Sequence, residues 1–286
     1  MKYHIERNSV QETLIIPLYG RKMCLELYPN LFHDETSIRL MKEIDYDFSE
    51  LAQNSESLMQ RFGFLEVAMR QNDLAWEVRD YLKSHPNAAV VNLGCGLDST
   101  GRHCDNGTCK IYNLDFPDVI TARNELLPPG EREENIPCNL NNTEWFGKID
   151  ASGGAVFFAA GVFYYFLTQQ VKSLVQAMAE AFPDGKLVFD AAGKSAVKLM
   201  LKTWIKDAKI KDVNAYFSVS DTKSELSAWS PKLRVSSRGY MLGYNDLKDP
   251  SVSGFFRFLS KVGDKVMNMQ IVRLDFEQKR FKTEGL

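Results

Sequence analysis

The sequence lacks an excess of either charge, a long apolar run and an apolar leader. Its 35 basic and 37 acidic residues leave a formal charge of -2, which gives no global electrostatic reason to bind nucleic acid or an anionic membrane. The longest apolar run, residues 153–167, is too short to span a bilayer. The first ten residues are largely polar and charged and contain no apolar core, so we expect no secretory signal. We therefore expect a cytoplasmic protein whose partner is a small molecule, and these features leave the oligomeric state open.

A cysteine framework is also missing. The five cysteines are odd in number and irregularly spaced, which argues against structural disulfides and suits a reducing compartment. His103, Cys104 and Cys109 invite a metal site. However, residues 105–108, between the two cysteines, are typical of a tight turn, and no second pair of ligands follows at the spacing of a zinc site. We expect no bound metal.

What the chain does contain is enough apolar sequence for a large core. Of its 286 residues, 44% are hydrophobic and 12% aromatic, which favours one α/β domain with appended elements over two independent domains. Apolar residues three and four positions apart predict helices over residues 38–44 and 58–76. This spacing ends near residue 86, so we divide the chain into an N-terminal helical cap, 1–86, and a main domain, 87–286, within one compact unit.

The main domain alternates short apolar runs with helical patterns. Four runs are typical of buried strands, namely 88–93, 110–114, 155–160 and 186–189. A helix lies between the last two, with Thr168 as its cap and Pro183 beyond its end. Strand, helix and strand in this order imply parallel pairing with right-handed crossovers.

The C-terminal part has a different pattern. Residues 233–235 and 269–276 are typical of strands, with a helix predicted over 246–260 between them. Two late strands can pair antiparallel at one edge of the sheet. The sequence therefore predicts an α/β fold, a doubly wound and mostly parallel sheet with helices on both faces and an antiparallel edge.

Two glycines follow the first of these strands directly. Gly94 and Gly96 allow the backbone to turn tightly and to approach a ligand without a Cβ in the way. Asp115 ends the next strand 19 positions after Gly96, in the range where an acid reaches the ribose hydroxyls of an adenosine ligand. Together they indicate a nucleoside-type cofactor. The alternative is a tight turn with an aspartate that caps a helix.

A third glycine is missing from this turn. The dinucleotide fingerprint needs one to start the helix that binds pyrophosphate, but Ser99 occupies the matching position. This disfavours a nicotinamide oxidoreductase. A cofactor without phosphate needs only the turn and the ribose acid, and S-adenosylmethionine is such a molecule.

Longer strings carry a specific resemblance. They are VVNLGCGLDS at residues 90–99, YNLDFPDVI at 112–120 and AAGVFYYF at 159–166, with EIDYDFS at 43–49. The chain resembles the family of leucine carboxyl methyltransferases and tetracenomycin polyketide O-methyltransferases, from about Thr13 to the last strand. The resemblance implies a class I, Rossmann-like methyltransferase fold with a seven-stranded sheet. It also implies S-adenosylmethionine as cofactor, with S-adenosylhomocysteine as its product.

The resemblance further implies a set of cofactor-binding residues. Gly94, Cys95 and Gly96 line the methionine and ribose portions in this interpretation, and Asp115 holds the ribose. Arg70 matches an arginine that binds the cofactor's carboxylate in relatives, which a guanidinium can do with two parallel hydrogen bonds. The alternative is an exposed helix arginine. The other residues expected at the cofactor are Phe116, Asn139, Leu140, Ala160 and Gly161.

Two positions depart from the family pattern. Relatives usually carry an acid near the adenine where this chain has Asn139, and a glutamate where it has Ala160. An asparagine can still accept a hydrogen bond from the adenine amino group, whereas alanine replaces neither the hydrogen bonds nor the charge of a glutamate. We expect either weaker cofactor binding or compensation by another acid such as Asp98.

The reaction itself asks little of the protein. Methyl transfer from a sulfonium is an in-line displacement that alignment and exclusion of water can accelerate. A carboxylate acceptor needs no general base, whereas a phenol needs one. His33 and His103 are the nearest candidates for a base and neither is assigned. Tyr165 matches a tyrosine of the family pattern and is a catalytic candidate, with core packing as its alternative.

The acceptor side is least defined by the sequence. We expect the N-terminal helices and residues 191–204 to close the acceptor pocket, with Trp204 and Phe217 as apolar walls. The basic cluster at 194–211 is interpreted as a solvated helix face, with an anion-binding patch as the alternative. The leading hypothesis is an O-methyltransferase acting on a carboxylate or hydroxyl of a small or polyketide-like acceptor. The alternatives are a non-catalytic cofactor-binding protein and a methyltransferase of protein C-terminal carboxylates.

Overall fold

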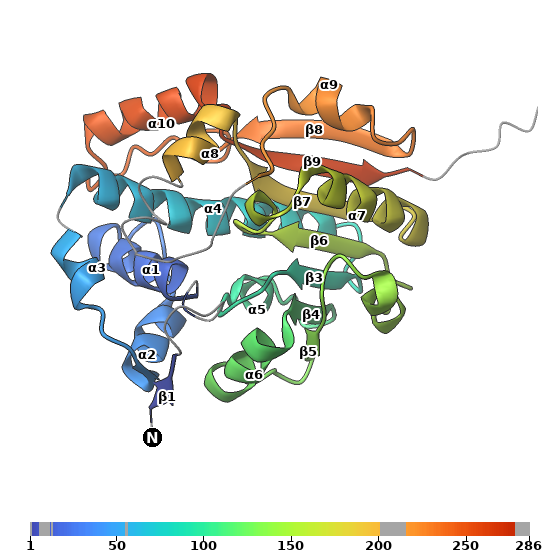
Figure 1. Ribbon diagram of the computed structural model, residues 1–286, viewed down its shortest axis with the longest axis horizontal. Helices are drawn as coiled ribbons and strands as arrows, with labels where there is room; N and C mark the ends of the chain where they lie inside the picture. Colours follow the sequence, from blue (N-terminus) through green and yellow to red (C-terminus); the bar gives the residue numbers. More distant parts are fainter. Residues whose placement is uncertain (1, 6–11, 13, 55–56, 201–215, 278–286) are drawn as a thin grey trace, which may run out of the picture.

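A seven-stranded sheet forms the centre of the computed structural model, which describes residues 2–5, 12, 14–54, 57–200 and 216–277 (Figure 1). Its strands are β3 (Ala89–Leu93), β4 (Lys110–Asp115), β5 (Glu133–Pro137), β6 (Ala155–Ala159), β7 (Lys186–Ala191), β8 (Leu233–Gly239) and β9 (Gln270–Phe276). They lie in the order β5-β4-β3-β6-β7-β9-β8. A separate parallel pair consists of β1 (Tyr3–His4) and β2 (Ile44–Asp45).

The sheet is parallel except at one side. Strands β5, β4, β3, β6 and β7 run parallel to one another, while β9 lies antiparallel to both β7 and β8. This confirms the predicted doubly wound, mostly parallel sheet with an antiparallel edge. The chain order reverses between β3 and β6, and in such folds this switch point is where a ligand binds beyond the carboxyl ends of the strands.

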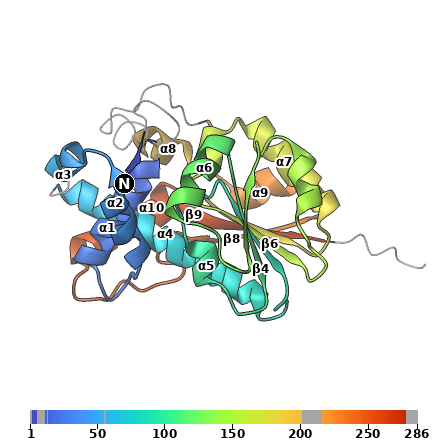
Figure 2. The same cartoon turned by 90° about the horizontal axis from the view of Figure 1, so that it is seen from below.

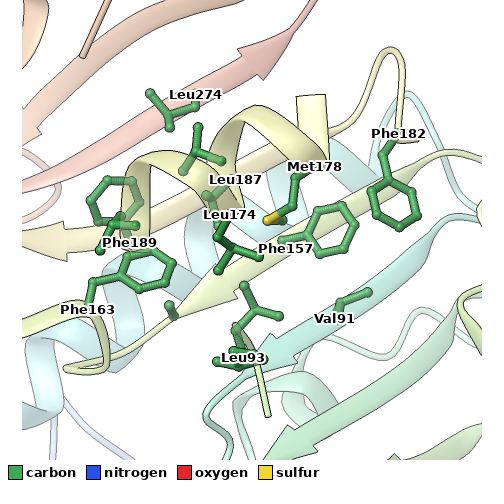
Figure 3. Packing of buried hydrophobic residues seen from close by; sticks show 14 of the residues in the cluster. Val91, Leu93, Phe157, Phe163, Leu174, Met178, Phe182, Leu187, Phe189 and Leu274 are labelled. Atoms are coloured by element: carbon green, nitrogen blue, oxygen red, sulfur yellow. The ribbon is translucent and has the colours of Figure 1, made fainter. Parts of the chain in front are cut away.

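Successive side chains of a strand point to opposite sides, and both faces of the sheet are buried because helices pack on each of them. Val91, Phe157 and Phe189 face helix α7 (Thr168–Ala181), whose Leu174 and Met178 pack onto them in Figure 3. Their sequence neighbours on the same strands point the other way, into a second cluster that helix α4 (Leu58–Leu82) covers. Helices α4 and α7 therefore pack on opposite faces of the sheet.

The remaining helices surround the sheet. They are α1 (Ile15–Leu27), α2 (Glu35–Glu43), α3 (Ser49–Asn54), α5 (Thr100–His103), α6 (Pro117–Leu126), α8 (Lys194–Met200), α9 (Thr222–Ser227) and α10 (Gly254–Val266), with 3-10 turns η2 (Thr143–Lys148) and η3 (Phe163–Tyr165). Figure 2 shows α1, α2, α3, α8 and α10 gathered at the end toward which the parallel strands run in Figure 1. Among the described residues, no helix is both long and apolar enough to cross a membrane.

Two boundaries predicted from the sequence are wrong. The helix expected over 246–260 begins only at Gly254, because Ser253 caps it through a hydrogen bond from the N–H of Phe256 to Oγ, at 3.2 Å. Thr168 is the first residue of α7 and not its cap. The cap is Leu167, whose N–H donates to Gln170 Oε1 at 2.8 Å, so the Gln170 side chain provides the capping hydrogen bond.

Candidate functional site

A cavity of about 740 Å³ opens at the carboxyl ends of β3, β4, β6 and β7. Its walls come from the loops after these strands, from α1 and the first half of α4 on one side, and from α8 and α10 on the other. The volume lies within the usual range of small-molecule sites, roughly 300–1,000 Å³. The cavity thus occupies the switch point of the sheet, where this fold class binds ligands.

The turn after β3 forms the floor of this cavity. Gly94 and Gly96 both have left-handed backbone angles, with φ of 66° and 47°, which favour glycine. A Cβ on Gly94 would also come within 2.6 Å of the Val162 side chain. Between them, the N–H of Cys95 donates to the carbonyl of Leu114 at 2.9 Å. The backbone geometry of the turn thus requires both glycines.

Two buried arginines hold the turn in place. Arg123 Nη1 donates to the carbonyls of Gly96 and Asp98, at 2.9 and 2.8 Å, and Arg21 Nη2 donates to the carbonyl of Leu97 at 3.0 Å. The Asp98 carboxylate accepts hydrogen bonds from Arg21 and from the N–H and Oγ1 of Thr100. Asp98 lines the cavity, but its carboxylate is already engaged in shaping the loop.

Asp115 is positioned beside this turn as the sequence predicts. Its Oδ2 accepts the N–H of Gly96 and its Oδ1 accepts the N–H of Phe116, both at 2.8 Å. Burial raises the pKa of the Asp115 carboxyl above its ordinary value, although these two donors oppose the rise. Each oxygen keeps a lone pair that can accept from a ribose hydroxyl. Phe116 lines the cavity and is 41% exposed, so a planar base can stack on it.

Arg70 and Asp190 form an ion pair at the other end of the cavity. Arg70 Nη1 lies 3.2 Å from Asp190 Oδ2, and Asp190 Oδ1 accepts the N–H of Gly161 at 2.6 Å. Burial disfavours the charged guanidinium, but the Asp190 carboxylate outweighs this, and the pKa of Arg70 is raised. Gly161 has a φ of 71°, and a Cβ there would lie 2.6 Å from Arg70 Nη1. Arg70 therefore rests directly on this glycine.

Asp190 also occupies the region where a family glutamate is missing. The register pairs Ala159 of β6 with Phe189 of β7. Ala160, directly after β6, and Asp190, near the end of β7, therefore lie at the same level of the sheet. Position 160 carries no acid, but the neighbouring strand β7 carries one, Asp190, at the same level. Sequence analysis missed Asp190, although an aspartate directly after a predicted strand at this edge of the sheet was a usable sign.

Glu66 is a second acid that sequence analysis did not single out. It lies on α4, one turn before Arg70, and lines the cavity. Its side chain is half-buried at the wall of the cavity. Burial raises the pKa of Glu66 to about 7, and the charge of Arg70 opposes the rise. A glutamate on the inner face of a helix, four positions from an arginine, was the available sign.

Several expected site residues lie elsewhere. Asn139 is exposed and its Oδ1 accepts the N–H of Asn141 at 3.0 Å, while Leu140 is buried in the core. Neither belongs to the cavity lining, so their contact with a cofactor stays a prediction. Phe217 is not a cavity wall, because it is 1% exposed and packs among the aromatic rings of the α7 side. Trp204 lies outside the described residues.

The tyrosines beside the cavity are better placed than the histidines. Tyr165 is 43% exposed and lines the cavity, as do the buried Tyr164 and Tyr240. Neither His33 nor His103 belongs to the lining. In the part of the chain that the structure describes, no group of three or more His, Cys, Asp or Glu side chains is arranged to hold a metal ion.

Comparison with known proteins places these observations in a family. The model of the leucine carboxyl methyltransferase family matches residues 25–179. The chain is 27% identical, over 188 residues, to the tetracenomycin polyketide synthesis O-methyltransferase TcmP of Streptomyces glaucescens, covering 65% of this chain and 67% of that protein.

Solved structures share the fold at low identity. A Thermobifida fusca protein designated a methyltransferase aligns with a TM-score of 0.56 at 14% identity, covering 75% of this chain and 83% of its own. The plantazolicin methyltransferase BamL, solved in complex with a triazolic desmethylPZN analogue and S-adenosylhomocysteine, aligns with a TM-score of 0.52 at 12% identity, covering 94% of this chain and 100% of its own. These likenesses support the class I, Rossmann-like architecture.

Proposed function

Since the chain belongs to the leucine carboxyl methyltransferase family, we propose that it transfers a methyl group from S-adenosylmethionine to an oxygen of a small or polyketide-like acceptor. The observation that carries this proposal is the cavity at the switch point, with the glycine turn and Asp115 on one side and the pair of Arg70 and Asp190 on the other. One end suits a nucleoside and the other a charged amino acid.

The residues of this cavity match the parts of such a methyl donor. Asp115 can accept from both ribose hydroxyls, and Phe116 offers an exposed ring for the adenine. Arg70 keeps guanidinium donors beyond the one directed at Asp190 and can take a carboxylate. Asp190 supplies a negative charge for the cofactor's ammonium or sulfonium group. When bound, the cofactor supplies the methyl group on a positively charged sulfur.

The rest of the cavity suits an apolar acceptor. Apolar side chains from three helices line it together: Met59 and Phe62 of α4, Leu199 of α8, and Leu259 and Val262 of α10. Apolar walls exclude water from the reacting atoms and align the acceptor, which is what an in-line methyl transfer requires. The relative from Streptomyces glaucescens is named as acting in tetracenomycin polyketide synthesis, and this supports a polyketide-like acceptor in the proposal.

Calorimetry and label transfer test the proposal separately. Titration with S-adenosylmethionine should show a single site, and no detectable heat at millimolar cofactor would contradict the proposal. Incubation with methyl-labelled cofactor and an extract of small molecules should then give a labelled acceptor. Binding without any labelled product would favour a non-catalytic cofactor-binding protein. Label on protein C-termini would favour a protein carboxyl methyltransferase.

A further inference from the structure

The charges around the cavity are unfavourable for an anionic acceptor. Among the described residues that line it, Arg21 and Arg70 are the only lysines or arginines. Arg21 is paired with Asp34 and Asp98, and Arg70 with Asp190. Both cations are thus already opposed by carboxylates, and a bound methyl donor would further occupy Arg70. Within the described part of this lining, a carboxylate acceptor finds no unpaired cation.

Glu66 adds a carboxylate that no neighbour neutralises by direct contact. The other acids of α4 have partners. Asp73 accepts the N–H of Met241 at 2.9 Å, and Glu77 accepts the hydroxyl of Tyr244 at 2.6 Å. Asp80 pairs with Lys83 at 3.1 Å. Among the described residues, no donor lies within hydrogen-bonding distance of the Glu66 carboxylate. It is thus an enclosed carboxylate available to a ligand.

A hydrogen bond holds the backbone at Glu66, even though its side chain has no hydrogen-bond partner in the part of the chain that the structure describes. The hydroxyl of Tyr240 donates to the carbonyl of Glu66 at 2.6 Å, which ties this turn of α4 to the segment after β8. Gly63, one turn earlier, and Arg70, one turn later, line the same cavity, so Glu66 lies on the helix face that borders it. The position is rigid enough to present one carboxylate to a bound acceptor.

We infer that Glu66 is the proton acceptor of the reaction and that the methylated atom is a hydroxyl oxygen on an aromatic, largely apolar molecule. This inference rests on the proposed function and deepens it, since it separates a hydroxyl from a carboxylate acceptor. A hydroxyl is neutral on entry and requires no cation to hold it. It also donates a hydrogen bond, which an unpaired carboxylate accepts.

The step balances in charge and electrons. Glu66 accepts the proton of the acceptor's O–H group. The electron pair left on that oxygen forms the new O–C bond with the methyl carbon, the S–C bond breaks, and its electron pair stays on sulfur as a neutral thioether. The carboxylate charge and the sulfonium charge are both lost, and the proton then passes from Glu66 to water.

The surroundings of Glu66 adjust its basicity. Among the described residues, Arg70 on α4, Tyr164 and Tyr165 in η3, Asp190 on β7 and Tyr240 after β8 are the ionisable groups that line the cavity with it on this side. Burial raises the pKa of Glu66 to about 7, against the opposing charge of Arg70. A base with a pKa near the working pH combines ionisation with a useful driving force for proton transfer. Below about pH 7 the group is protonated and cannot accept the proton.

The test compares two aromatic acceptors in wild type and in Glu66→Gln. The probes are 1-naphthol and 1-naphthoate, which share a ring system and differ in the accepting group, with methyl-labelled S-adenosylmethionine as donor. Wild type should methylate 1-naphthol and prefer it over 1-naphthoate. Glu66→Gln should lower kcat for 1-naphthol about 10²–10⁴-fold, the usual contribution of a general base. In wild type, kcat/KM for 1-naphthol should fall below about pH 7, and this limb should vanish in the variant.

A third probe distinguishes proton transfer from a structural role. A nitro-substituted 1-naphthol that is already ionised at neutral pH needs no base, so Glu66→Gln should lose far less activity on it than on 1-naphthol. Asp80→Asn serves as the control, because it removes one negative charge from the same helix outside the cavity lining. Its rates on all three probes should match wild type.

The outcomes separate this inference from the proposed function. Equal losses on the ionised and un-ionised naphthols, full activity of Glu66→Gln on 1-naphthol, or a preference for 1-naphthoate would overturn the inference. Normal cofactor binding with no turnover of either naphthol would also overturn it. Among the measurements of this test, failure of wild type to bind S-adenosylmethionine would contradict the proposed function as well. Unchanged S-adenosylhomocysteine affinity in Glu66→Gln should show that the variant is folded.

Discussion

At the scale of single residues, Asp190 is an acid on the strand beside Ala160, where the sequence comparison with the family expects a glutamate. Both stand at the carboxyl ends of adjacent strands. Asp190 accepts the N–H of Gly161 and forms an ion pair with Arg70. If its charge faces the methyl donor, Asp190→Asn should weaken S-adenosylhomocysteine binding about 10–100-fold, the usual effect of a charged hydrogen bond. Ala160→Glu in that background should restore part of the affinity. Calorimetry measures both, and unchanged affinity in Asp190→Asn would contradict this assignment.

Gly161 gives a second prediction at this scale. Its φ of 71° and the 2.6 Å approach of Arg70 Nη1 leave no room for a Cβ. Gly161→Ala should therefore lower the free energy of unfolding by about 1–3 kcal/mol and weaken S-adenosylhomocysteine binding because Arg70 must move. Urea unfolding and calorimetry check the two effects. Gly147→Ala is the control, since a Cβ there meets nothing within 4 Å, and a similar loss in both variants would argue against the role of Arg70.

At the scale of elements, α4 links the sheet to the C-terminal segment. Its fully buried Glu77 accepts the hydroxyl of Tyr244 at 2.6 Å and lies 3.5 Å from Arg273 of β9. Tyr244→Phe leaves this buried carboxylate with one donor fewer and should lower the free energy of unfolding by about 1–3 kcal/mol. Urea unfolding tests this. The exposed Tyr216 supplies the matched control Tyr216→Phe, which should change stability by less than about 0.5 kcal/mol.

Element prediction succeeded where burial leaves a clear pattern. Strands β3, β4, β6 and β7 are buried on both faces and therefore contain continuous apolar runs. The edge strand β5 was missed, because Glu133 and Glu134 give it no such run. The helix start at Gly254 depended on a single capping side chain, that of Ser253, and several polar residues upstream of it looked equally suitable.

At the scale of the whole molecule, the cavity joins parts that are distant in the chain. Residues of α1, α4, the strand loops, α8 and α10 share its lining, so a ligand should stabilise all of them together. S-adenosylhomocysteine at about 100 times its Kd should raise the free energy of unfolding by about 2.7 kcal/mol. Thermal or urea unfolding measures this. Reduced nicotinamide dinucleotide is the control, and equal stabilisation by it would contradict the interpretation of Ser99.

The sequence by itself determined the type of fold and one half of the candidate site. Gly94, Gly96 and Asp115 are recognisable because strand ends impose them locally: a turn with positive φ requires glycine, and the acid follows at a set distance along the chain. Arg70 and Gly161 were expected only from the resemblance to a family. In each of these cases a short string contains the information.

Tertiary structure alone decided which acids face the cavity. Asp190 is placed beside Ala160 by the register of β6 and β7, and Glu66 is enclosed because α4 passes between the sheet and the C-terminal segment. The same packing puts Phe217 in the core and away from the cavity. Burial and electrostatic neighbourhood depend on contacts between residues more than a hundred positions apart, as with Arg70 and Asp190, and no local pattern encodes them.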